Sequence, residues 1–121
     1  MFYSEDSFRF WLRSIRERPG MWLGEKSLFA LVHFWHGYTF GRSVEIDEHS
    51  NEPRISDRAV THFGQHFMDG FEQFAYSHFG CKRTTQGWWR LIAKNCGTDA
   101  QAFDKFFELL DEFLAQKGSA L

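Results

Sequence analysis

The chain has little cysteine, little proline and no excess of basic charge. Among 121 residues there are two cysteines and two prolines, and 16 acidic residues outnumber 14 lysines and arginines. Cys81 and Cys96 cannot form the disulfide framework of a small secreted domain. So few prolines favour long, uninterrupted helices. A net charge of −2 argues against a general nucleic-acid binder, because such proteins are normally basic.

Long apolar runs and the usual catalytic signatures are also missing. No run approaches the roughly 20 residues of a membrane-spanning helix, and the first residues lack the pattern of a signal peptide. We therefore expect a cytoplasmic protein with reduced thiols and no membrane partner. The sequence contains no phosphate-binding loop, dinucleotide fingerprint or serine elbow. This pattern predicts a protein that is not an enzyme and needs no cofactor.

Aromatic residues are abundant and follow helical spacing. Phenylalanine, tryptophan and tyrosine make up 19 % of the chain, so we expect a core built mainly from rings. Near the N-terminus Phe8, Trp11, Leu12 and Ile15 fall at i, i+3, i+4 and i+7, which is one helix face. Similar patterns predict helices over residues 4 or 6 to 17, 27–41, 56 or 57 to 79, 85–95 and 99–116. Without a convincing strand ladder, they predict an all-α, single-domain bundle of four to five helices.

Two of these segments carry more specific expectations. Over residues 18–24 we expect a type II turn with Gly20 at positive φ, followed by Trp22 and Leu23 filling the bundle. In the 27–41 segment Phe29 and Phe40 widen the apolar stripe to most sides, which predicts a central helix surrounded by others. Thr98 and Gln101 form the capping-box pattern ahead of the last helix.

Acidic side chains gather in two places. Residues 42–55 interrupt the helical pattern, and the alternation of Val44 and Ile46 with charges allows a very short strand. Loops on rigid bundles often carry recognition, and acidic surfaces steer basic partners. We therefore predict a partner-binding site in this loop, with the last helix as a second candidate surface. The predicted residues are Glu45, Asp47, Glu48 and Glu52 in the loop, and Asp104, Glu108 and Asp111 in the helix.

Two alternative functions stay open. His62 and His66 lie at i and i+4 and could hold a metal ion in a hydrolase, although the glutamate of the zinc motif is missing. Arg9, Arg13 and Arg16 on the first helix could instead contact phosphates in a nucleic-acid-binding module. Scattered surface histidines and a solvated arginine face are the simpler interpretations of both patterns.

Short motifs spread over most of the chain resemble a known family. They are Arg-Pro-Gly-Met-Trp-Leu-Gly at 18–24, Ser-Leu-x-x-Leu and His-Gly-Tyr within 27–38, Phe-Gly at 79–80, Gly-Trp-Trp at 87–89, and Ala-Phe-x-x-Phe-Phe-Glu-Leu-Leu-Asp-Glu-Phe at 102–113. In this order they are similar to small helical bacterial immunity proteins of polymorphic toxin and contact-dependent growth inhibition systems. The resemblance implies that the chain binds one cognate toxin domain, often a nuclease such as an RNase, and covers its active site. It implies no catalytic residues.

Overall fold

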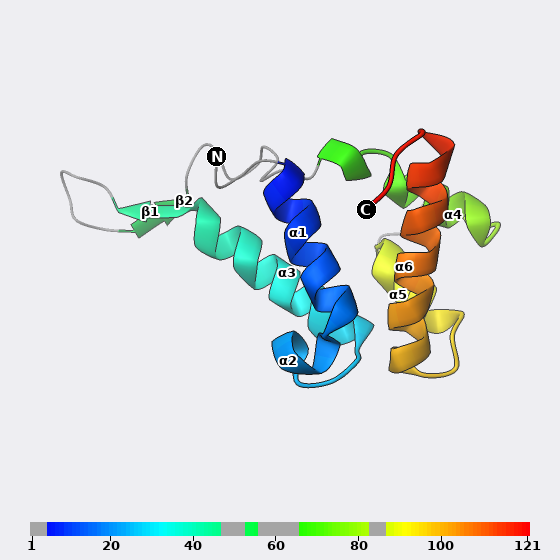
Figure 1. Ribbon diagram of the computed structural model, residues 1–121, viewed down its shortest axis with the longest axis horizontal. Coiled ribbons are helices and arrows are strands. Elements are labelled where there is room, and N and C mark those ends of the chain that lie inside the picture. The colour runs from blue at the N-terminus through cyan, green and yellow to red at the C-terminus, as the bar shows by residue number, and fades with distance from the viewer. Residues whose placement is uncertain (1–4, 47–52, 56–65, 83–86) are drawn as a thin grey trace.

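The computed structural model describes residues 5–46, 53–55, 66–82 and 87–121. These residues form six α-helices, one short 3-10 helix and a two-stranded hairpin (Figure 1). The predicted all-α bundle is therefore confirmed, with a small hairpin added. In chain order the elements are α1 (Glu5–Glu17), α2 (Pro19–Leu23), α3 (Leu28–Ser43), β1 (Val44–Ile46), β2 (Pro53–Ile55), η1 (His66–Met68), α4 (Phe71–His78), α5 (Trp88–Lys94) and α6 (Asp99–Gln116).

The last helix, α6, is the element that the others pack against. It contacts α3, α4 and α5, and eight of its side chains are buried. Its start is set by the predicted capping box: the backbone N–H of Gln101 donates to Thr98 Oγ1 at 3.1 Å. In return Gln101 Oε1 accepts from the Thr98 backbone N–H, also at 3.1 Å. The predicted bounds, 99–116, are confirmed.

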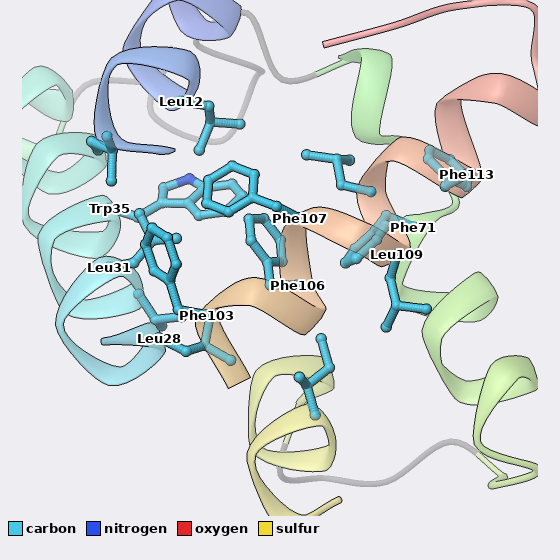
Figure 2. Packing of buried hydrophobic residues seen from close by; sticks show 14 of the residues in the cluster. Leu12, Leu28, Leu31, Trp35, Phe71, Phe103, Phe106, Phe107, Leu109 and Phe113 are labelled. Carbon is cyan, nitrogen blue, oxygen red and sulfur yellow. The ribbon is translucent and has the colours of Figure 1, made fainter. Parts of the chain in front are cut away.

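The centre of the core is a cluster of rings from four helices. Phe106 of α6 lies 5.1 Å from Trp88 of α5, 5.6 Å from Phe71 of α4 and 6.3 Å from Trp35 of α3, measured between ring centroids. Most of these pairs are tilted or edge-to-face, the geometry that aromatic rings prefer. Figure 2 shows Phe106 and Phe107 between the α3 side chains and Phe71. The expectation of a ring-built core is confirmed.

The first helix joins this core through its predicted face. Phe8, Leu12 and Ile15 are fully buried, and Trp11 stacks on Tyr38 of α3 at 5.1 Å. The buried cluster thus runs from α1 through α3 to α6. In Figure 1, α1 and α3 lie on one side of the molecule, and α4, α5 and α6 lie on the other.

The segment 18–24 differs from the prediction. It contains the short helix α2, with Pro19 at its first position, where a backbone N–H has no helical partner and its loss costs nothing. Gly20 lies inside this helix, and the residue at positive φ is Gly24, at 82°. The predicted type II turn at Gly20 is therefore wrong. Leu23 packs against the core as expected, but 42 % of Trp22 is exposed, so Trp22 does not fill the bundle.

The helix predicted over residues 56 or 57 to 79 is also interrupted. Residues 56–65 lie outside the described part of the chain. Beyond them η1 ends at Met68, and Gly70 takes a φ of 93° before α4 begins at Phe71. An α-helix cannot continue through a residue with that φ. The helix is therefore broken within the predicted range, and Gly70 is the point of the break.

The very short strand that the sequence allows at Val44 and Ile46 is present. β1 pairs antiparallel with β2, with Val44 opposite Ile55, Glu45 opposite Arg54 and Ile46 opposite Pro53. β1 follows α3 without a gap, so the hairpin segment (residues 44–55) continues from the end of α3. In Figure 1 the two described strands, β1 and β2, extend away from the helices.

Candidate partner-binding site

The first predicted site lies in the hairpin segment. Its backbone pairing sets Glu45 directly across from Arg54 in the ladder. Asp47, Glu48 and Glu52 lie outside the described residues, in the stretch of chain that joins β1 to β2. The segment carries four carboxylates and one arginine. Glu45 therefore lies on a strand that extends beyond the end of α3 (Figure 1), and the other three carboxylates follow it in the sequence.

The second predicted site, on α6, is already paired with cations of the same chain. Asp111 forms a two-pronged ion pair with Arg16 of α1, at 2.7 and 3.0 Å. Asp104 lies 2.6 Å from Lys26, in the connection between α2 and α3. Glu108 lies 3.4 Å from Lys105 one turn earlier. Partial neutralisation makes this surface a weaker attractor for a basic partner than three isolated carboxylates would be.

The Arg16–Asp111 and Lys26–Asp104 ion pairs cross a groove between the α1–α2 region and α6. The groove encloses about 530 Å³, and Phe103 and Phe107 line it together with Arg16, Lys26, Asp104 and Asp111. The Arg16 guanidinium lies over the Phe107 ring at 5.2 Å. The charged side chains around this groove therefore connect α1 and the chain after α2 to α6 at the surface.

A third surface was not predicted from the sequence. Phe29 and Phe40 of α3 are 56 % and 60 % exposed, so the expectation that this helix is surrounded by others is wrong. His33 and His36 are exposed between them. The four residues lie at i, i+4, i+7 and i+11, which is one face of the helix. We call them the α3 stripe.

The α3 stripe borders a groove on the side of α5. The groove encloses about 500 Å³, and its lining includes Trp35, Trp88, Trp89, His36 and Phe40. Trp89 lies 6.0 Å from Phe29 and 5.9 Å from His33 between ring centroids. The signal that could have found this face is the pair of histidines, since two polar rings interrupt an otherwise apolar helix at helical spacing.

The arginines of the first helix have partners within the chain. Arg9 donates to the carbonyl oxygen of Ala120 and lies over the Phe67 ring at 4.3 Å. Arg13 donates to the carbonyl oxygen of Leu121 at 2.7 Å, and Arg16 pairs with Asp111. A nucleic acid would have to compete with these contacts for the arginines of α1.

The histidine pair proposed as a metal site is only partly described. His62 lies outside the described residues, and His66 is exposed with Nδ1 3.3 Å from Asp69. Within residues 5–46, 53–55, 66–82 and 87–121, no three His, Cys, Asp or Glu side chains cluster closely enough to hold a metal ion.

The two cysteines are free thiols in different settings. The Cys81 thiol lies 3.1 Å from the carbonyl oxygen of Lys82. Cys96 packs against the buried cluster, and this burial raises the pKa of its thiol; nearby Lys105 lowers it and Glu108 raises it by less. Cys96 is therefore more completely protonated than a free cysteine and is a weaker nucleophile.

Comparison with protein-family models, with curated proteins and with solved structures finds nothing that matches this chain. Among the described helices none combines the length and the apolar character required to cross a bilayer. The surfaces described above and the resemblance of the sequence motifs are what bear on the function of this chain.

Proposed function

We propose that this chain is an immunity protein that acts in the cytoplasm and neutralises one cognate bacterial toxin domain. The toxin would be a nuclease, in particular an RNase of a contact-dependent growth inhibition or other polymorphic toxin system. The chain would bind it directly and cover its active site. No catalytic residue, cofactor or metal ion takes part in this function.

The observation that carries the proposal is the acidic hairpin segment at the end of α3. A nuclease active site is basic because it holds phosphate, and an acidic surface attracts it over long range. Glu45 supplies part of that charge on β1, which follows α3 directly, and Asp47, Glu48 and Glu52 supply the rest in the residues that follow it in the sequence. The carboxylates of Asp104, Glu108 and Asp111 rank second, because each lies beside a cation of its own chain.

A growth-rescue assay tests the proposal. The toxin domain encoded by the adjacent gene is induced in bacteria with and without this chain, and the chain is expected to restore growth. The double variant Asp47→Asn/Glu48→Gln is expected to rescue poorly. The control Glu25→Gln/Glu72→Gln removes the same two charges outside the hairpin segment and should rescue fully. The proposal fails if the adjacent gene encodes no toxin, or if the chain does not relieve its toxicity.

A further inference from the structure

The α3 stripe has the geometry of a binding face. Phe29 and Phe40 are separated by three helical turns, about 16 Å along the axis at 1.5 Å per residue. Both rings are more than half exposed, and His33 and His36 fill the space between them on the same face. Large exposed rings gathered on one face are unusual for a surface that only water contacts.

The groove beside the stripe gives this face a concave edge. Three tryptophans line it, Trp35 from α3 and Trp88 and Trp89 from α5. Trp35 is buried and Trp88 lies in the core cluster at 5.1 Å from Phe106, so the floor of the groove is rigid. A rigid apolar groove beside exposed rings is the arrangement in which interface hot spots are found.

The charge at the end of the stripe indicates the kind of partner. Phe40 lies three residues before the end of α3. The hairpin segment, whose sequence contains four carboxylates, begins with β1 directly after α3. An occupant that fits both regions has apolar side chains for the groove and a basic surface for the hairpin segment. The toxin nuclease of the proposed function has that basic surface, and this inference rests on that function.

We infer that the α3 stripe and the α3–α5 groove are the anchoring part of the toxin interface, adjoining the hairpin segment. The hairpin segment and this anchoring part act at different stages of binding. Charges outside the buried contact mainly set the association rate, whereas buried aromatic contacts mainly set the dissociation rate. The hairpin segment therefore speeds the encounter, and Phe29, Phe40 and Trp89 hold the complex together.

Binding kinetics with a catalytically inactive form of the adjacent-gene toxin domain test this division. Phe29→Ser/Phe40→Ser is expected to raise the dissociation rate constant at least tenfold and to change the association rate constant less than about twofold. Asp47→Asn/Glu48→Gln is expected to lower the association rate constant several-fold at low salt, with a nearly unchanged dissociation rate. Phe10→Ser is the matched control, because Phe10 of α1 is 65 % exposed and lies outside both regions.

Circular dichroism and thermal melting of each variant establish that it is folded before its kinetics are interpreted. Unchanged dissociation from folded Phe29→Ser/Phe40→Ser overturns this inference and leaves the proposed function standing. An equal effect of Phe10→Ser overturns it as well. A third result would also overturn it: sedimentation shows that the wild-type chain is a dimer and that Phe29→Ser/Phe40→Ser is a monomer. The α3 stripe would then bind a second copy of this chain. If the wild-type chain does not bind the toxin domain, the proposed function and this inference both fail.

Discussion

Asp99, the first residue of α6, caps the start of α3, 70 positions earlier in the chain. Its Oδ1 accepts a hydrogen bond from the backbone N–H of Phe29 at 3.1 Å, and its Oδ2 accepts one from the Ser27 hydroxyl. Ser27 Oγ in turn accepts from the backbone N–H of Ala30 at 2.9 Å. One carboxylate therefore stabilises the N-termini of two helices, which carry a partial positive charge.

Removing this carboxylate should destabilise the fold. Asp99→Ala is expected to lower the free energy of unfolding by about 1–2 kcal/mol, since a lost helix cap costs that much. Asp104→Ala is the control: its ion pair with Lys26 is exposed, and pairs of that kind contribute about 0–1 kcal/mol. Urea denaturation followed by circular dichroism measures both. Equal stabilities of the Asp99→Ala variant and the wild type would contradict the capping role.

The two glycines of the 18–24 segment should respond in opposite ways to substitution by alanine. Gly20 is helical and has no atom within 4 Å of an added Cβ, so Gly20→Ala is expected to stabilise the protein by about 0.4–1 kcal/mol. Gly24 has a φ of 82°, so Gly24→Ala is expected to destabilise it by about 1–2 kcal/mol. Melting temperatures of the two variants give the sign directly, and a shift in the same direction for both would contradict the assigned backbone.

Phe106 should be among the most sensitive core positions, because its ring contacts side chains of three other helices. Phe106→Ala is expected to cost about 3–5 kcal/mol of unfolding free energy, the range for a fully buried phenylalanine. Phe10→Ala removes the same atoms from an exposed site and should change stability by less than about 0.5 kcal/mol. Chemical denaturation of both variants checks the contrast, which disappears if Phe106 is not at the centre of the core.

Cys96 should react slowly with thiol reagents. Burial raises the pKa of its thiol, so less thiolate is present at any pH below that pKa than in a free cysteine. In a Cys81→Ser variant, where Cys96 is the only thiol, iodoacetamide alkylation is expected to be slower than with glutathione at pH 8. As the pH is raised, the alkylation rate of Cys96 should still increase at a pH where the rate for glutathione no longer changes. A Cys96 that reacts as fast as glutathione would contradict this prediction.

The sequence predicted most of the helices because their signals are local. Thr98 and Gln101 fix the start of α6 within one turn, and the spacing of Phe8, Leu12 and Ile15 identifies the buried face of α1. The errors occur where local signals allow two structures. Pro19 can begin a helix as readily as a turn, and Gly70 can bend a helix or end it. Tertiary packing decides between these outcomes, and the local patterns of a single sequence do not reveal that packing.

The surfaces were harder to predict than the fold. Acidic residues are visible in the sequence, but their partners are not: Arg16 lies 95 residues before Asp111, and Lys26 lies 78 residues before Asp104. The α3 stripe was missed for a related reason. Apolar residues on all sides of a segment predict burial, and only the packing of the other helices leaves Phe29 and Phe40 exposed.

The position of α6 in the chain has a consequence for how the protein is made. Residues 99–116 follow all the other described helices in sequence, yet they supply the surface on which α3, α4 and α5 pack. On the ribosome the apolar faces of the earlier helices therefore emerge well before the helix that buries them. During synthesis the buried side chains of these helices, such as Leu31, Trp35 and Phe71, are therefore incompletely packed. This is the stage at which aggregation and chaperone binding compete with folding.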